Sequence, residues 1–331
     1  MSMLRAGVIG TGSMGKNHVR VYAELPNVEL VCIADPQSDL SFFEKKYKAK
    51  TYTDYKKMLD EEELDLVTVA TPTITHKDVA LDVMGRGIHL LLEKPIADSA
   101  EEADEIIAAA EKNGVKLMVG HLERFNPAVI ELKRRIQEGE LGKVYKVDVN
   151  RVGPIPPRIQ DVGVTIDLAV HDIDVMRFLT EAEPERVFAE TEQRIHSKRE
   201  DLLAGIIRFT NRTICYLNVN WLTATRIRKL YITGEKGMFV IDYIQQTLHF
   251  FENAASNGPN AQYNMIKEGK MIRYPIHKKE PLKEEIAHFV ECIEKDTQPL
   301  VSGEDGKKAI KIALDILTSA KTQEVVKNET Y

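Results

Sequence analysis

Short apolar runs alternate with helical patterns through residues 1–120 of the chain. The runs have the length of strands and contain so few polar residues that we expect both faces to be buried, as in a parallel sheet. They occupy residues 4–9, 29–34, 64–71, 88–92 and 116–119. Apolar positions recur at helical spacing in the segments 16–25, 75–84 and 99–112. The alternation predicts a parallel sheet with right-handed crossover connections, as in a Rossmann domain.

After His121 the pattern changes, because predicted strands follow one another with few helices between them. Residues 215–221 alternate between apolar side chains and Tyr or Asn, which is typical of a strand with one buried face. Strands are predicted at 144–151, 186–196, 202–209, 213–222, 227–233, 238–243 and 247–251, and helices at 128–138, 282–295 and 306–326. The chain is therefore predicted to be an α/β protein with two domains. Residues 1–121 form the Rossmann domain, and residues 122–331 form an α/β domain with a large open, predominantly antiparallel sheet.

Composition adds mainly exclusions. The chain has 331 residues, of which 43% are hydrophobic and 29% charged, and its net charge of -6 argues against a nucleic-acid-binding surface. The apolar runs are much shorter than a membrane span, and the N-terminus has no signal-peptide pattern. Cys32, Cys215 and Cys292 have no paired spacing, so we expect free thiols in a reducing compartment. We expect a cytoplasmic protein whose partners are small molecules, with neither nucleic acid nor membrane among them.

A glycine-rich turn joins the first predicted strand to the first predicted helix. In a turn of this spacing, the first glycine permits the tight bend, the second admits a pyrophosphate, and the third lets helix and strand pack closely. The N-terminus of the helix then favours an anion. We assign the whole turn to dinucleotide binding: Gly10, Thr11, Gly12, Ser13, Met14 and Gly15.

Asp35 ends the second predicted strand, about 20 residues after the glycine-rich turn. A carboxylate there can bind the ribose 2′-hydroxyl of NAD and would repel the 2′-phosphate of NADP, so the predicted cofactor is NAD. The alternative is a simple turn at the end of a strand. The next strand ends at the same sheet edge, so Thr71, Pro72 and His76 are also assigned to the cofactor, although His76 fits the first turn of the following helix better.

Glu93, Lys94 and Pro95 follow the apolar run 88–92. Ligands bind at the carboxyl edge of open α/β sheets, so we expect Glu93 and Lys94 to face the cofactor. Pro95 fixes its own φ and favours an extended Lys94, which would aim the lysine side chain, and a cis bond before Pro95 is compatible with the sequence. The alternative is a solvated loop.

Asp167, His171 and Asp174 recur at helical spacing in the otherwise apolar segment 161–179. The three polar residues would lie on one helical face, which suggests a functional stripe. A structural alternative makes Asp167 an N-cap, His171 a core histidine and Asp174 a solvated residue. A metal site at His171 and Asp174 lacks a further ligand cluster, so no metal is predicted.

The motifs Gly10-x-Gly12-x-x-Gly15, Asp35, Glu93-Lys94-Pro95 and Asp167-x-x-x-His171 together resemble those of the Gfo/Idh/MocA oxidoreductases, over nearly the whole chain. The resemblance implies a Rossmann domain and an α/β domain whose open sheet usually supports dimers or tetramers. A homodimer or homotetramer is therefore expected. The resemblance also implies an active site made of Lys94, Asp167 and His171. Ala169 stands where the family often has glycine, a departure that leaves the reactive groups in place.

Residues 121–127 and 151–163 further resemble family members that oxidise nucleotide-linked amino sugars such as UDP-N-acetylglucosamine, at C3. Arg124, Arg151 and Arg158 are therefore candidates for binding the diphosphate, because guanidinium groups suit phosphate oxygens. Asp161 is a fourth candidate for substrate contact. Salt bridges at the surface or between domains are the alternative for the arginines.

The expected reaction is reversible hydride transfer between a secondary alcohol of a sugar and NAD. His171 would accept the alcohol proton while Lys94 stabilises the alkoxide, or Lys94 would itself be the base, with Asp167 orienting the pair. Dehydrogenation of a free sugar or inositol, NAD-dependent cleavage of glycosides, and NAD sensing without catalysis remain alternatives.

Overall fold

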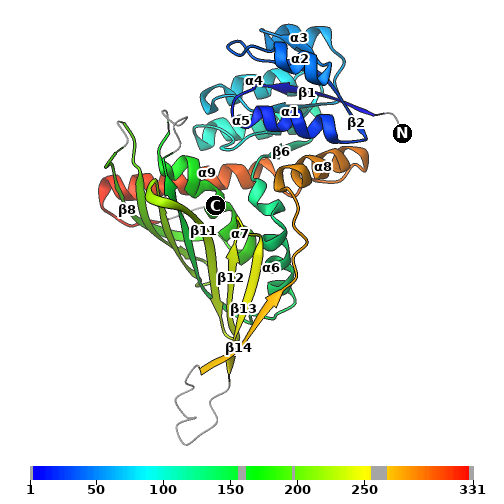
Figure 1. The fold of residues 1–331 in the computed structure, drawn as a ribbon. Helices are drawn as coiled ribbons and strands as arrows, with labels where there is room; N and C mark the ends of the chain where they lie inside the picture. The colour runs from blue at the N-terminus through cyan, green and yellow to red at the C-terminus, as the bar shows by residue number, and fades with distance from the viewer. Residues whose placement is uncertain (1–2, 156–161, 196–197, 255–266, 328–331) are drawn as a thin grey trace, which may run out of the picture. The chain divides into compact units, whose positions relative to one another are not determined.

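The computed structural model describes residues 3–155, 162–195, 198–254 and 267–327, and it divides into two compact units (Figure 1). The first unit consists of Met1–Leu122 and Glu280–Lys311, and the second of Glu123–Lys279 and Ile312–Tyr331. Residues 280–311 thus belong to the Rossmann unit. The predicted domains, 1–121 and 122–331, place this segment in the second domain instead.

A parallel sheet forms the centre of the first unit, with the strand order β3-β2-β1-β4-β5-β6, which confirms the Rossmann prediction. The strand order reverses at β1, so the carboxyl ends of β1 and β4 flank the switch point where ligands bind in such sheets. The strands are β1 (Leu4–Ile9), β2 (Val28–Ala34), β3 (Lys50–Tyr52), β4 (Leu66–Val69), β5 (His89–Leu92) and β6 (Leu117–Val119). The helices are α1 (Gly15–Glu24), α2 (Ser41–Tyr47), α3 (Tyr55–Glu61), η1 (Thr73–Thr75), α4 (His76–Met84), α5 (Ala100–Asn113), α8 (Pro281–Glu294) and the first part of α9 (Gly303–Thr322).

The C-terminal helices complete this unit by close backbone packing. The amide of Val119 in β6 donates a hydrogen bond to the carbonyl of Val301, 3.3 Å away. A methyl group at Gly303 would lie 2.7 Å from the side chain of Ile107 in α5, so only glycine lets α9 begin at this distance. Residues far apart in the sequence therefore share one core.

The second unit contains a sheet with the strand order β14-β13-β12-β11-β7-β10-β9-β8-β15. Every neighbouring pair is antiparallel except β7 and β10, which confirms a predominantly antiparallel sheet. The strands are β7 (Val144–Pro154), β8 (Pro184–Glu192), β9 (Leu202–Phe209), β10 (Ile214–Asn220), β11 (Leu222–Gly234), β12 (Gly237–Asp242), β13 (Thr247–Ala254), β14 (Lys267–Tyr274) and β15 (Val326–Lys327). The helices are η2 (Leu122–Phe125), α6 (Pro127–Gln137), η3 (Thr165–Ala169), α7 (Val170–Thr180) and the end of α9.

One face of this sheet is covered and the other is open. Helix α6 contacts β12 and β13, and α7 contacts β7 (Figure 1). In β10 the predicted alternation holds, because Cys215, Leu217 and Val219 are buried whereas Tyr216 is 40% exposed. The covered face is the core of the unit, and the open face keeps large side chains at the surface.

Some elements differ from the prediction. Strand β14 was not predicted, since its sequence KEGKMIRY is strongly charged and nearly all of it is exposed. The short elements α2, β3 and α3 were not predicted either. The stretch 253–260 is polar and contains glycine, which predicts a loop, and it lies largely outside the described residues.

All three cysteines are buried and unpaired. No helix in the described parts of the chain is both long and apolar enough to cross a membrane.

Candidate active site

Each glycine of the turn after β1 has a distinct structural reason. Gly10 has a φ of +90°, and a Cβ there would lie 2.6 Å from the Ala70 carbonyl oxygen. A Cβ at Gly15 would lie 1.9 Å from the Gly10 oxygen, whereas nothing lies within 4 Å of the corresponding point at Gly12. No side chain caps α1 at Met14, which leaves the helix N-terminus open to an anion. The turn therefore has the shape that binding of a dinucleotide pyrophosphate requires.

Asp35 holds the glycine-rich turn from the end of β2. Its Oδ2 accepts hydrogen bonds from the amide and hydroxyl of Thr11, at 2.7 and 2.9 Å, and its Oδ1 accepts from the amides of Gln37 and Ser38. Burial alone would raise the pKa of Asp35, but these hydrogen bonds lower it below its ordinary value. Asp35 is therefore an anion at neutral pH, as binding a ribose hydroxyl requires.

A pocket of about 690 Å³ opens beside this turn in the first unit. Gly10, Gly12, Asp35, Thr71 and Pro72 line it, so five of the residues predicted to bind the cofactor surround one cavity. Its size is that of an ordinary cofactor site.

Replacing Asp35 with alanine is expected to relax the preference for NAD over NADP, because the carboxylate that repels a 2′-phosphate is removed. Loss of the bonds to Thr11 should also raise the KM for NAD. Steady-state kinetics with both cofactors measures the change, and Asp39→Ala is a control at an exposed carboxylate nearby. An unchanged ratio of kcat/KM values would show that Asp35 does not read the ribose.

His76 links the loops that follow β4 and β5. It is 1% exposed, its Nδ1 lies 2.9 Å from the Pro95 carbonyl oxygen, and its Nε2 lies 3.0 Å from the Thr71 carbonyl oxygen. Burial lowers the pKa of His76, so the neutral ring donates to one of these carbonyls at a time. His76 is the first residue of α4, and it holds the loops after β4 and β5 together.

Glu93 and Lys94 point to different environments. Glu93 is 6% exposed, and its Oε1 lies 2.9 Å from Nε2 of His18 in α1, while its Oε2 accepts from the Lys94 amide. Burial would raise the pKa of Glu93, but the contact with His18 lowers it. Lys94 is only half-buried, and its bond to Pro95 is cis. Glu93 thus anchors the backbone from which the Lys94 side chain extends.

A second buried carboxyl group lies near Glu93. Glu285 in α8 is fully buried, and neither of its carboxylate oxygens has a hydrogen-bond partner in the described structure. Burial, and next the charge of Glu93, raise the pKa of Glu285 well above its ordinary value. Burial inside the first unit therefore favours the protonated form of Glu285.

Replacing Glu285 with glutamine is expected to stabilise the protein at neutral pH. The pKa of Glu285 is raised in the folded state. The protonated side chain therefore contributes fully to the free energy of unfolding below its ordinary pKa of 4.5. This contribution is lost as the pH rises from 4.5 towards the pKa of the folded state. The uncharged amide avoids this loss, so the gain should grow by up to about 1.4 kcal/mol per pH unit in that window. Urea unfolding followed by circular dichroism from pH 5 to 8 measures the gain. Glu291→Gln, at an exposed position of α8, is the control, and a gain independent of pH would contradict the prediction.

Asp167 and His171 lie at the start of the buried helix in the second unit. Asp167 belongs to a π-helical turn, Thr165–Ala169, and His171 to the first turn of α7. Both side chains are half-buried, whereas most of α7 is buried. A π-helical turn often occurs at functional sites, and it changes the simple helical spacing assumed from the sequence.

Asp172 and Asp174 anchor this helix to its surroundings. Asp174 is fully buried and accepts from Nε and Nη2 of Arg124, at 2.8 and 2.6 Å, so its predicted solvated alternative is wrong. Asp172 accepts from Nε of Arg151 at 2.5 Å, and Glu123 accepts from Nη2 of the same arginine at 3.1 Å. Burial raises the pKa of Asp172 even though Arg151 opposes the rise.

Two of the three predicted substrate arginines are buried in the second unit. Arg124 and Arg151 are 4% and 1% exposed, and both bind carboxylates within the second unit. Most of their guanidinium nitrogens therefore form salt bridges and are not available to a substrate diphosphate. Arg158 and Asp161 lie outside the described residues. In the described parts of the chain, no cluster of three or more His, Cys, Asp or Glu side chains could hold a metal. Asp174, which was considered as a metal ligand, instead forms an ion pair with Arg124.

Sequence reasoning missed several supporting residues: His18, Glu123, Asp172 and Glu285. His18 lies on the apolar face of α1, three residues after Gly15, and Asp172 lies among apolar residues. A polar residue in an apolar stretch is a weak indication of a buried polar contact, so both could have been noticed. Glu285 follows Glu284 and Lys283 in a charged first turn, which gives no sign of burial.

Comparison with known proteins identifies the class. Residues 4–121 match the family model described as "Oxidoreductase family, NAD-binding Rossmann fold" for Gfo/Idh/MocA proteins, and residues 129–240 match the Gfo/Idh/MocA C-terminal domain. The chain belongs to the Gfo/Idh/MocA oxidoreductase family. It is an NAD-dependent enzyme of the sugar dehydrogenase class, and NAD is its cofactor.

Individual relatives match nearly the whole chain. The UDP-N-acetylglucosamine 3-dehydrogenase of Acidithiobacillus ferrooxidans is 27% identical over 96% of this chain and 97% of its own. A solved structure of that enzyme covers 97% of this chain and 99% of its own, with a TM-score of 0.86 and 26% identity. The myo-inositol 2-dehydrogenase of Thermotoga maritima is 25% identical over 98% of this chain and 100% of its own. Levoglucosan dehydrogenase in complex with NADH and L-sorbose shares the fold, with a TM-score of 0.87 at 22% identity and full coverage of both chains.

Proposed function

We propose that the protein is a dehydrogenase of a nucleotide-linked amino sugar such as UDP-N-acetylglucosamine, acting on the C3 hydroxyl. The observation that carries this proposal is the full-length similarity to a UDP-N-acetylglucosamine 3-dehydrogenase in both sequence and fold. Lys94, Asp167 and His171 are all present, which supports catalysis over NAD sensing without chemistry.

The proposed chemistry assigns one task to each side chain. NAD supplies the hydride acceptor when bound. His171 accepts the proton of the reacting hydroxyl, a role suited to an imidazole at neutral pH. The Lys94 ammonium stabilises the negative charge that develops on the alcohol oxygen, and Asp167 orients the two groups. In the alternative assignment Lys94 itself accepts the proton.

An inositol or free sugar is the second candidate substrate. The full-length similarity to myo-inositol 2-dehydrogenase favours it, because the identities to the two relatives differ by only 2 percentage points, 27% against 25%. Both substrates present a ring with a secondary hydroxyl, so the same three side chains can serve either one.

NADH formation at 340 nm tests the proposal. The reaction mixture contains NAD with one of UDP-N-acetylglucosamine, its uronate, UDP-glucose, free N-acetylglucosamine, glucose or myo-inositol. Signal confined to nucleotide sugars supports the proposal, and signal only with free sugars or inositol replaces the substrate. No signal with any of them would favour an NAD-dependent glycosidase or a sensor.

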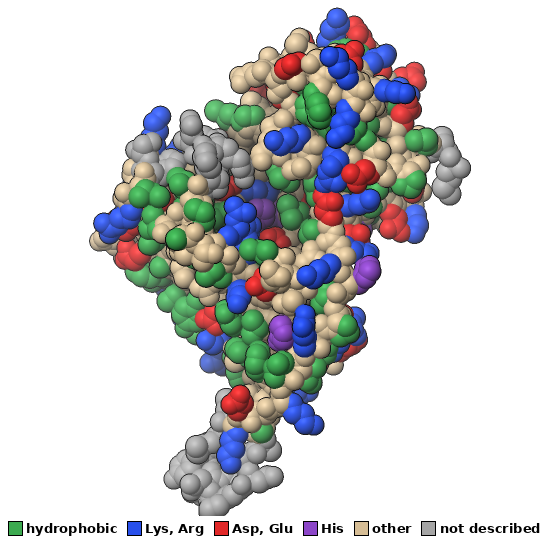
Figure 2. All heavy atoms as spheres, viewed as in Figure 1, with side chains coloured by type: hydrophobic (Ala, Val, Ile, Leu, Met, Phe, Trp, Pro, Cys, Tyr) green, Lys and Arg blue, Asp and Glu red, His purple; other side chains and the backbone are tan. Residues whose placement is uncertain are grey.

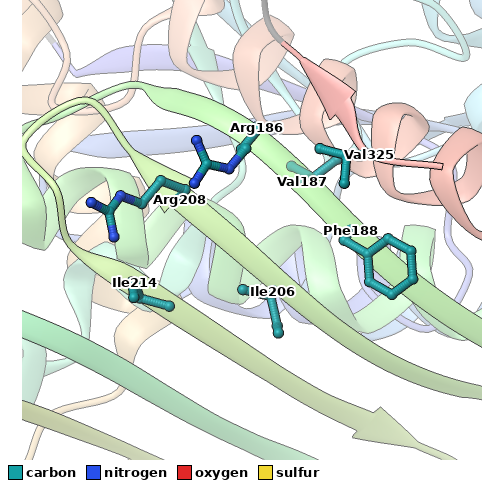
Figure 3. A pocket seen from close by; sticks show the side chains of 7 residues that line it. All are labelled: Arg186, Val187, Phe188, Ile206, Arg208, Ile214 and Val325. Atoms are coloured by element: carbon teal, nitrogen blue, oxygen red, sulfur yellow. The ribbon is translucent and has the colours of Figure 1, made fainter.

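The open face of the second sheet is the proposed interface between copies of this chain. Phe188, Ile206 and Tyr216 lie opposite one another on neighbouring strands and are 37–44% exposed. Arg186 and Arg208 form a cross-strand pair beside them (Figure 3), and the buried Nε of Arg208 has no described partner. Figure 2 shows hydrophobic side chains next to Lys and Arg on the visible face of this unit. A second copy would cover the apolar row and could offer carboxylates to the arginines.

Ile206→Glu tests this interface, since a charge in the apolar row should weaken association. Light scattering after gel filtration measures the mass, and Glu190→Lys, on the same face but outside the apolar row, is the control. A native protein that is monomeric at micromolar concentration would reject a homodimer or homotetramer.

We also propose a cytoplasmic location. The three buried thiols are unpaired, and free cysteines persist in reducing compartments.

A further inference from the structure

Two arginines lie directly opposite each other on the covered face of the second sheet. Arg228 in β11 pairs in register with Arg151 in β7. Residues opposite each other on antiparallel strands project from the same face, and like charges in such a pair destabilise a sheet. A guanidinium group stays charged, so neither residue can relieve the repulsion by losing a proton.

A third arginine joins this pair through an irregularity in β11. The register between β7 and β11 shifts between Leu222 and Ile227, and such bulges re-aim side chains. Arg226 lies within the shifted stretch and packs over Gly153. A Cβ added at Gly153 would lie 3.5–3.7 Å from the Cα, Cβ and Cγ atoms of Arg226. Arg151, Arg226 and Arg228 line one small pocket together with Trp221 and Leu168.

The two carboxylates nearby, Asp172 and Glu123, carry fewer charges than the three arginines. Asp172 and Glu123 both bind Arg151, which still leaves its buried Nη1 without a hydrogen-bond partner in the described structure. Among the described residues, the side chains of Arg226 and Arg228 make no hydrogen bond or ion pair, although Arg228 is half-buried. Burial and the charge of Arg151 lower the pKa of Arg228, and the charges of Glu123 and Asp172 only partly offset this effect.

We propose that this pocket, lined by Arg151, Arg226 and Arg228, binds an oxyanion group of the substrate. A phosphate or carboxylate would satisfy Nη1 of Arg151 and offset the repulsion between Arg151 and Arg228, since guanidinium groups bind such oxygens in pairs. Leu168 in the pocket wall follows Asp167 directly in the π-helical turn, so the anion would bind beside a residue assigned to the reaction. This inference rests on the proposed function and narrows it to substrates that carry an anionic group.

The test measures anion binding apart from turnover. Inorganic phosphate is titrated into the full-length protein, and its dissociation constant is taken from the rise in melting temperature. The variants are Arg228→Gln, Arg226→Gln and, as a control, Arg273→Gln at an exposed position of β14. Phosphate binding should weaken at least about tenfold in Arg228→Gln and severalfold in Arg226→Gln, and it should be unchanged in Arg273→Gln. Because Arg226 is exposed, that variant keeps the test valid if Arg228→Gln does not fold.

Kinetics with three substrates then distinguishes the possible sources of the anion. A raised KM for UDP-N-acetylglucosamine in the two pocket variants assigns the site to a phosphate, and a raised KM for glucuronate alone assigns it to a carboxylate. Free N-acetylglucosamine carries neither group and should be unaffected. If phosphate binding and every KM are the same in the pocket variants as in the control, the anion site is rejected while the dehydrogenase proposal stands. If phosphate binding falls as expected but no nucleotide sugar is oxidised, the site stands and the substrate is wrong.

Discussion

Replacing Lys94 with alanine should lower kcat by about 10² to 10⁴-fold while NAD still binds. The side chain extends from a loop that Glu93 and His76 hold in place, so its removal should leave the cofactor pocket intact. A positive charge beside a developing alkoxide is worth several kcal/mol in the transition state, because it is already positioned and partly shielded from water. The measurements are kcat with the preferred substrate and the dissociation constant of NAD by calorimetry.

Two further variants make the result specific. Lys112→Ala removes an exposed lysine of α5 and should change neither quantity. Lys94→Arg keeps the charge but cannot act as a base at neutral pH. Partial activity in Lys94→Arg would assign Lys94 to charge stabilisation and His171 to proton transfer, and loss as complete as in Lys94→Ala would favour Lys94 as the base. Full turnover in Lys94→Ala would remove this residue from the mechanism.

Replacing Asp174 with alanine should destabilise the second unit by about 3–5 kcal/mol. Asp174 is fully buried, and the Arg124 guanidinium that it binds through two hydrogen bonds is 4% exposed. Without the Asp174 carboxylate, the buried positive charge of Arg124 loses the carboxylate that binds it through two hydrogen bonds. Trp221 is the single tryptophan of the chain and lies buried in the same unit, so its fluorescence during urea unfolding reports on this transition.

A surface pair provides the comparison. Glu138 binds Arg134 at the end of α6, where both side chains are about half exposed, so Glu138→Ala should cost less than about 1 kcal/mol. The double variant Asp174→Leu with Arg124→Met should recover much of the loss, because it removes both charges together. A cost for Asp174→Ala as small as that for Glu138→Ala would contradict the importance of the buried pair.

The parts of the fold that the sequence predicted well are those decided by neighbouring residues. The glycine-rich turn could be predicted because the positive φ of Gly10 and the contact between Gly15 and Gly10 both lie within one strand, turn and helix, although the contact of Gly10 with Ala70 does not. The alternation in β10 was visible because one face is buried and the other is open. The assignment of Thr71 and Pro72 to the cofactor is a prediction from the rule that parallel strands end at one edge, and both residues line the same pocket as Gly10.

What could not be predicted depends on residues far apart in the sequence. The spacing of Asp167, His171 and Asp174 suggested one polar face, but the π-helical turn and the burial of Asp174 against Arg124 divide the three residues. Asp172, which is also buried and forms an ion pair with Arg151, was not predicted to be important. The pocket of Arg151, Arg226 and Arg228 depends on strand register, which short-range patterns do not fix.

The return of residues 280–311 to the first unit has a consequence for biosynthesis. A ribosome makes the Rossmann strands first, but the segment that contacts β6 and α5 emerges only after strands β7 to β14 of the second sheet have been translated. The nascent N-terminal unit must therefore wait with part of its apolar surface uncovered, while the second sheet forms behind it. Premature termination before codon 280 should thus release a chain that chaperones bind and proteases degrade, rather than a smaller protein that still holds NAD.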